Sequence, residues 1–99
     1  MQFVIPFQLP TYVYDGTSTS LSVSLYKFGL VQGTPNNEPI DPKWIAMADS
    51  VMDVAANGSS TTTVTSATID GDGNLTIDFT TSDAEGVMES ITGFLVINT

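Results

Sequence analysis

The sequence predicts an α+β domain in which a mainly antiparallel sheet of about five or six strands packs on one principal helix. Three observations predict this class. Several short segments alternate apolar and polar residues, Gly-containing turns separate them, and residues 42–56 have the spacing of a helix. Ninety-nine residues allow one domain, residues 1–99, without room for a second core. An all-β fold with a helical insertion is the alternative.

The first third of the chain has the pattern of strands. Residues 3–9 alternate, and Pro6 within them lacks a ladder donor, which predicts an edge strand or a bent one. Residues 11–14 continue the extended pattern as far as a turn at Asp15-Gly16. Residues 21–28 alternate and predict a strand that ends at Gly29. The composition of residues 33–39 predicts a loop.

A helix is predicted over residues 42–56. Asp41 stands where an N-cap belongs, and Pro42 follows at the first helical position, where its missing N–H costs nothing. The apolar residues cover more than one stripe and leave only a narrow polar ridge of Asp49, Ser50 and Asp53. A face this apolar predicts that either the sheet wraps the helix closely or its far side meets another chain.

The last forty residues predict a hairpin and a terminal strand. Strands at 64–69 and 75–79 flank the turn of residues 70–74. Residues 82–85 match a capping box, so residues 83–92 fit either a short helix or a strand. The apolar run 94–97 predicts a central strand or one paired across an interface.

The ionisable side chains exclude several classes of function. Eleven carboxylates and two lysines give a net charge of −9, and the chain has no Arg, His or Cys. Nucleic acid and anionic membranes would repel such a chain, and the usual ligands of zinc, haem and iron–sulfur sites are missing. The start of the chain lacks the basic region of a signal peptide, so we expect a soluble protein without one. We expect it not to be an enzyme and to need no cofactor, because an imidazole base and a thiolate nucleophile are both absent.

Two sets of residues are weaker candidates for binding. Asp70, Asp72 and Asn74 have the spacing that opens a calcium loop, but Leu75 and Thr81 stand where that loop needs Gly and Glu. A solvated turn is therefore the preferred interpretation, and calcium is a minor alternative. Tyr12, Tyr14 and Trp44 could stack on a glycan or could pack in the core. The carboxylates Asp83, Glu85 and Glu89 are interpreted as helix N-terminal or plain surface charges.

One short segment resembles a known class of proteins. Residues 40–44, Ile-Asp-Pro-Lys-Trp, are similar to the Ile-Asp-Pro-Lys-aromatic segment found in structural proteins of tailed bacteriophages, usually before Leu-Pro. Here Ile45-Ala46 follows, so the likeness covers five residues. The acidic, cysteine-free and Thr-rich composition is similar to that of small virion components, such as capsid decoration, head-fibre and tail proteins. The resemblance implies a structural role in a virion and no catalytic residue.

These observations predict a virion structural protein of the decoration or fibre type. Such a subunit would be a homo-oligomer that buries apolar area against its own copies or against a major capsid or other virion protein. A glycan- or calcium-binding surface module of a larger assembly, using Tyr12, Tyr14 and the 70–74 turn, is the alternative. The predicted interface residues are Phe3, Ile5, Trp44, Met47, Val51, Val54, Phe94 and Val96.

Overall fold

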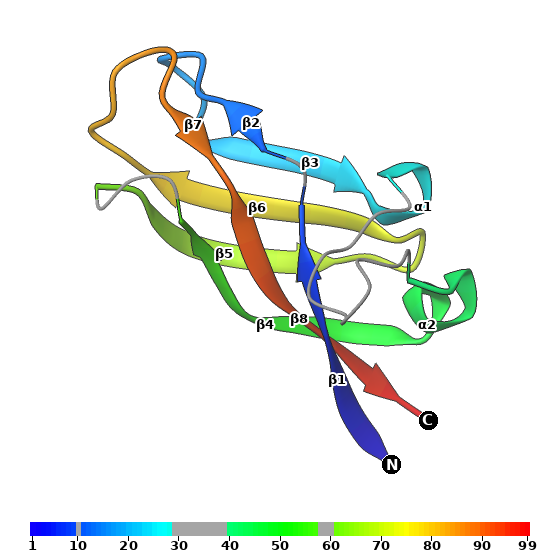
Figure 1. The fold of residues 1–99 in the computed structure, drawn as a ribbon. Helices are drawn as coiled ribbons and strands as arrows, with labels where there is room; N and C mark the ends of the chain where they lie inside the picture. Colours follow the sequence, from blue (N-terminus) through cyan, green and yellow to red (C-terminus); the bar gives the residue numbers. More distant parts are fainter. Residues whose placement is uncertain (10, 29–39, 58–60) are drawn as a thin grey trace.

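The computed structural model describes residues 1–9, 11–28, 40–57 and 61–99 (Figure 1). The predicted loop at 33–39 lies outside these ranges. The described residues form eight strands and two short helices. The strands are β1 (Gln2–Gln8), β2 (Tyr12–Val13), β3 (Ser20–Ser24), β4 (Ala48–Ala56), β5 (Thr63–Ile69), β6 (Asn74–Thr80), β7 (Met88–Glu89) and β8 (Ile91–Asn98). The helices are α1 (Leu25–Phe28) and α2 (Pro42–Ala46).

The strands form three antiparallel sheets (Figure 1). The sheet of order β1-β8-β4 and the sheet of order β3-β6-β5 have three strands each, and β2 pairs with β7 in a small ribbon. This is the all-β alternative, and the expected packing of one sheet on a principal helix is wrong. The prediction that residues 94–97 belong to a central strand is confirmed, because β8 lies between β1 and β4.

The core lies between the two larger sheets. Leu75 and Ile77 of β6 and Leu95 and Ile97 of β8 are completely buried. They belong to one hydrophobic cluster that also takes in Ile45 of α2 and residues of β1 and α1. Alternate residues of each central strand point into this cluster, so the period-two pattern in the sequence comes directly from burial on one face.

The predicted helix over residues 42–56 begins correctly and ends ten residues early. The Asp41 carboxylate accepts a hydrogen bond from the Lys43 N–H at 3.0 Å, and Pro42 occupies the first turn, as expected. The helix then ends at Ala46, and residues 48–56 form β4 along β8. The apolar surface attributed to a long helix is therefore the surface of a strand.

Two bulges in β4 explain why this strand resembles a helix in the sequence. The register with β8 shifts between Ala48 and Ser50 and again between Met52 and Ala55, so β4 carries one extra residue at each place. Core-side residues consequently recur at Ala48, Val51 and Val54, three apart, as they would on a helix. In the second bulge Asp53 has a φ of 52°, the left-handed conformation that Asp tolerates better than most residues.

The other strand predictions are largely confirmed. Strand β3 ends at Ser24, and Leu25–Phe28 form α1, so extending that strand to residue 28 is wrong. The alternation of apolar and polar residues runs past the end of β3 because Leu25, the first residue of α1, is also buried in the core. The β5–β6 hairpin around residues 70–74 is confirmed. Of the two alternatives for residues 83–92, the strand is observed, as β7 and the start of β8.

Among the strands of the described ranges, β1 is an edge strand, as Pro6 predicts. The Leu9 N–H donates to the Ile91 carbonyl at 2.8 Å, and the Thr99 N–H donates to the Met1 carbonyl at 2.8 Å. Odd-numbered residues of β1 therefore direct their backbone groups toward β8, and even-numbered ones toward the free edge. Because Pro6 is even-numbered, its missing N–H interrupts the free edge. That edge is a poor template for a further strand.

Candidate functional site

The structure divides the eight predicted interface residues between different surfaces. Phe3, Ile5, Trp44, Val51 and Val54 are half-buried and pack against the core cluster. Phe94 and Val96 lie on the opposite face of the β1-β8-β4 sheet, where Phe94 is half-buried and Val96 is buried. Met47, just after α2, is exposed. The eight residues thus do not form one continuous patch.

Trp44 is occupied within the fold. Its ring meets the ring of Phe3 edge-on, with the centroids 5.3 Å apart, and the Lys43 ammonium lies 4.7 Å from the Trp44 ring centroid. The ring contact with Phe3 stabilises the docking of α2 on β1, whereas the contact with Lys43 lies within α2. Trp44 therefore attaches α2 to β1, in agreement with the prediction that it could pack in the core.

The outer face of the β1-β8-β4 sheet is the first candidate surface. Its register-paired positions are Gln2, Val4, Pro6 and Gln8 of β1, Thr92, Phe94, Val96 and Asn98 of β8, and Ser50, Met52 and Ala55 of β4. None of these eleven side chains is ionisable. Val4 is 45% exposed and Met52 is 43% exposed. In a chain of net charge −9, the paired positions of this face thus carry no charge, and Asp53 in the second bulge of β4 is the carboxylate beside them. Depletion of charge marks the centres of protein interfaces.

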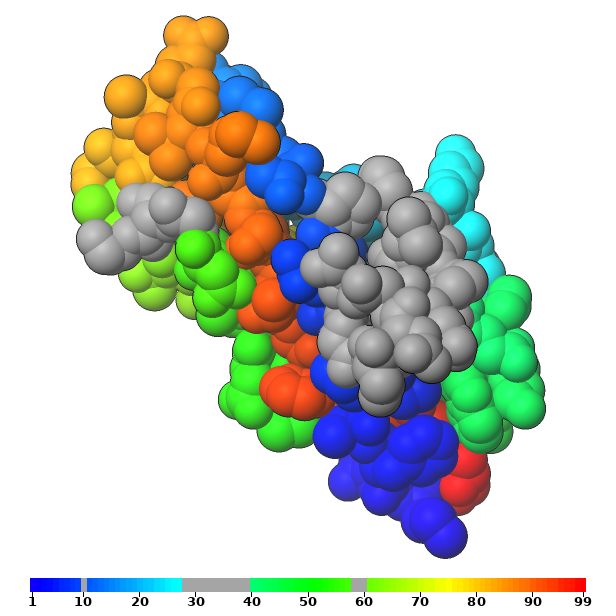
Figure 2. Space-filling model, viewed as in Figure 1, coloured from blue at the N-terminus to red at the C-terminus, as the bar shows by residue number. Residues whose placement is uncertain are grey.

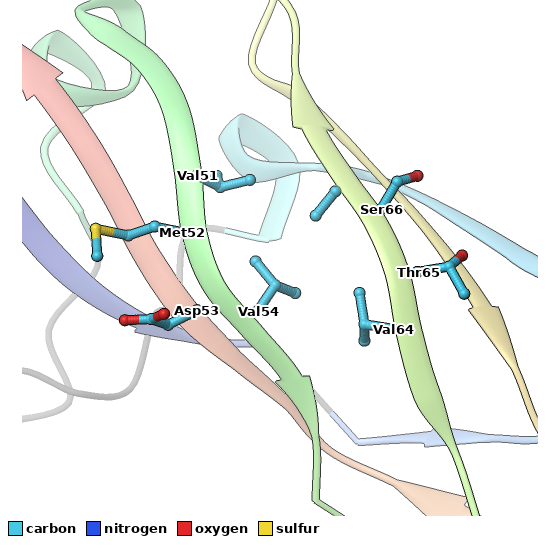
Figure 3. Close-up of a pocket in the computed structure, with 8 residues that line it drawn as sticks. Val51, Met52, Asp53, Val54, Val64, Thr65 and Ser66 are labelled. Atoms are coloured by element: carbon cyan, nitrogen blue, oxygen red, sulfur yellow. The ribbon is translucent and has the colours of Figure 1, made fainter.

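A second candidate is a groove of about 180 Å³ between β4 and β5 (Figure 3). No strand ladder joins these two neighbouring strands in the described part of the chain. Val51, Val54 and Val64 point into the space between them, whereas Met52 and Asp53 point to the other side of β4. Three valine side chains thus point into the groove, and none of its charged lining residues does. Asp53 lies instead on the same side of β4 as Met52, next to the paired positions of the outer face.

A buried polar cluster lies behind the β2–β7 ribbon. Glu89 of β7 is only 1% exposed, so its interpretation as a surface or helix N-terminal charge is wrong. The Thr62 hydroxyl lies 2.8 Å from Glu89 Oε1, 3.0 Å from Asp83 Oδ2 and 2.8 Å from the Thr81 hydroxyl. The Thr61 hydroxyl also donates to Asp83. The cluster joins the segment before β5, the segment after β6, and β7.

The residues proposed for glycan or calcium binding do not come together. Tyr14 is buried, Tyr12 is half-buried, and both rings lie 6.3 Å from the ring of Phe79 near the end of β6. The 70–74 turn lies at the other end of that strand, beside α1 (Figure 1). Six residue steps at about 3.3 Å each separate the two ends of β6 by roughly 20 Å. The tyrosines and the turn therefore cannot form a single site.

Within the turn, the Asp70 carboxylate is engaged by its own loop. It accepts hydrogen bonds from the Asp72 N–H at 2.8 Å, from the Asn74 N–H at 2.9 Å and from the Asn74 side-chain amide at 3.2 Å. The bond from the Asn74 N–H is the main reason why the pKa of Asp70 lies below its ordinary value. This is the hydrogen bonding expected of a turn that Asp and Asn stabilise through their side chains.

No family model, curated protein or solved structure matches this chain. Among the helices that the structure describes, neither has the length or apolar character needed to cross a bilayer.

Sequence reasoning missed the most exposed members of these surfaces. Val4, Met52, Val13 and Met88 are exposed apolar residues that were not among the predicted interface residues. In the sequence each looks like an ordinary member of a strand or helix pattern. Only the pairing of β1, β4 and β8, and of β2 with β7, shows which face each side chain occupies. The scarcity of charge in residues 91–98 was the one available signal.

The turn after β2 provides a pH-dependent prediction. The Asp15 carboxylate accepts hydrogen bonds from the Ser18 hydroxyl and from the Thr17 and Ser18 N–H groups, and these lower its pKa to about 2. A lowered pKa contributes stability that is present above the ordinary value of 3.8 and is lost as the pH falls through about 2. We expect Ser18→Ala to raise this pKa, so the acid-dependent loss of stability should be smaller in total and complete at a higher pH, as measured by urea unfolding between about pH 7 and 2. An acid profile identical to that of the unmodified protein would contradict this assignment.

Proposed function

We propose that this protein is a structural assembly subunit, of the decoration or fibre type in a virion, which associates through the outer face of the β1-β8-β4 sheet. The absence of ionisable side chains from the eleven paired positions of that face carries the proposal. Subunits of net charge −9 repel one another, so they can associate closely only where carboxylates are absent. The resemblance of residues 40–44 to a segment of phage structural proteins supports the virion setting.

The structure favours contact through the face rather than through the free edge of β1. Pro6 has no backbone N–H to donate at that edge, and this disfavours the addition of another strand there. On the face, Val4 and Met52 remain 45% and 43% exposed, and burying apolar area contributes about 25 cal/mol per Å². A second copy offers the same uncharged face, as a two-fold contact requires.

The size of this face suggests more than one contact per subunit. The three strands of this sheet have seven to nine residues each, with a rise of about 3.3 Å per residue and a spacing of about 4.8 Å between neighbouring strands. The face of the sheet therefore has an area of roughly 350 Å². A stable interface of standard size buries about 800 Å² on each partner. One face therefore gives a weak pairwise contact, and an assembly needs a second surface or a repeated array.

The native mass of the protein tests this proposal. Sedimentation velocity between about 1 and 200 μM should show concentration-dependent association of the unmodified chain, because a small interface is weak. Val4→Glu and Met52→Glu each place a carboxylate on the face and should yield monomers. Thr68→Glu, at an exposed position of β5, adds the same charge elsewhere and should leave association unchanged. A monomer at every concentration, or equal behaviour of all three variants, would overturn the proposal.

A further inference from the structure

The β2–β7 ribbon forms a tip at the end of the molecule opposite the chain termini (Figures 1 and 2). In this ribbon Tyr12 pairs with Glu89, and Val13 pairs with Met88. The first pair faces inward, where Glu89 is buried and Tyr12 packs on Phe79. The second pair faces outward, and Val13 and Met88 are each 58% exposed. Among the exposed large apolar residues of the described chain, only Met1 is more exposed.

Two carboxylates, those of Asp15 and Glu85, lie close to the ends of the ribbon. Asp15 follows β2 by two residues, and Glu85 precedes β7 and packs against Gly16, where an added Cβ would lie 3.3 Å from the Cβ of Glu85. Burial is the first cause of the raised pKa of Tyr12, and the charge of Asp15 is among the further causes, so Asp15 lies within electrostatic reach of β2. Both lysines, Lys27 and Lys43, belong to α1 and α2, away from the tip (Figure 1).

We infer that the tip is a docking site for an extended segment of a partner protein in which apolar residues alternate with Lys or Arg. Val13 and Met88 would pack against the apolar side chains, while Asp15 and Glu85 would pair with the cations. Each of the two strands of the ribbon has an unpaired outer edge in the described part of the chain. An extended segment could therefore also form backbone hydrogen bonds with one of these edges. This inference rests on the proposed function in one respect: the partner would be the shell protein that the subunit decorates.

Charge decides between this occupant and a second copy. The chain has only two lysines, both in short helices, so none of its strands combines apolar and basic residues. A second copy would bring further carboxylates to an acidic rim, and like charges disfavour such a contact. A basic partner would instead be steered toward the tip, and its binding would weaken as salt screens the charges.

Synthetic peptides provide the test. The probe is a peptide of about eight residues that alternates Lys and Val, titrated into ¹⁵N-labelled protein at about 20 and 300 mM NaCl. We expect shifts at the amides of β2 and β7 that weaken at high salt. Met88→Ser and Glu85→Gln should each weaken binding about tenfold. Asp72→Asn, which removes the same charge from the 70–74 turn at the other end of β6, should not.

Two peptide controls separate a docking site from general attraction to an acidic protein. A peptide of alternating Lys and Ser should bind far more weakly, because it cannot cover Val13 and Met88. Equal binding of this peptide, or equal effects of Glu85→Gln and Asp72→Asn, would overturn the inference. So would the absence of shifts at β2 and β7. The native-mass experiment is independent: if Val4→Glu leaves association unchanged but the peptide binds the tip, the assembly proposal fails and the docking site stands.

Discussion

Gly73→Ala is expected to destabilise the protein by about 3 kcal/mol, which lowers the melting temperature of a domain of this size by roughly 12–20 °C. Gly73 has a φ of 74°, a conformation that costs an alanine about 1 kcal/mol. A Cβ at this position would also lie 2.5 Å from a ring carbon of Tyr26 and 2.9 Å from Cγ2 of Ile45. Tyr26 is partly exposed and can move, but Ile45 is 3% exposed and cannot move without disturbing the core.

Two other glycines separate the causes of this effect. Gly86 also has a positive φ, 93°, but a Cβ there meets nothing within 4 Å, so Gly86→Ala should cost about 1 kcal/mol. Gly71, in the same turn as Gly73, has open space and no positive φ, so Gly71→Ala should have little effect. Chemical denaturation of the three variants measures the series. Equal costs for Gly73→Ala and Gly86→Ala would show that the contact with Ile45 is unimportant.

A regular strand with one buried face can be recognised from the sequence alone. In β6, Leu75, Ile77 and Phe79 are buried and the residues between them are not, so alternation is visible without any knowledge of the partner strand. The start of α2 was predictable for a similar reason, because the Asp41 cap and Pro42 act within one turn.

The errors have a common cause in contacts that are distant in the sequence. Each bulge of β4 makes sense only beside β8, about forty residues later, and without that strand the spacing of Val51 and Val54 indicates a helix. The uncharged outer face likewise requires the register of three strands. Carboxylates are mostly exposed in proteins, so nothing local could indicate that Glu89 is buried.

Glu89→Ala is expected to destabilise the protein by about 2–4 kcal/mol. The side chain is 1% exposed, and its removal leaves a cavity behind the β2–β7 ribbon. It also deprives the Thr62 hydroxyl of an acceptor at 2.8 Å, in a cluster that joins β7 to the segments before β5 and after β6. Glu89→Gln keeps the shape and an acceptor oxygen, so it should cost only about 1 kcal/mol. Urea unfolding at neutral pH measures both variants. A loss below about 1 kcal/mol for Glu89→Ala would mean that the cluster does not hold the ribbon in place.

Tyr12 reports on the same carboxylate without depending on stability. Burial is the main cause of its raised pKa, and the charge of Glu89 is the next. Ultraviolet titration of Glu89→Gln should therefore show a lower pKa for Tyr12 that still exceeds the ordinary value of 10.0, because burial persists. A raised pKa contributes stability that is present below this ordinary value and is lost as the pH rises through the folded-state pKa. In Glu89→Gln the contribution of Tyr12 to stability should begin to fall at the same pH as in the unmodified protein. The total loss of stability from Tyr12 ionisation should be smaller in the variant. If the Tyr12 titration is identical in both proteins, the Glu89 carboxylate is not in electrostatic contact with Tyr12, and the packing of β7 against β2 differs from that described.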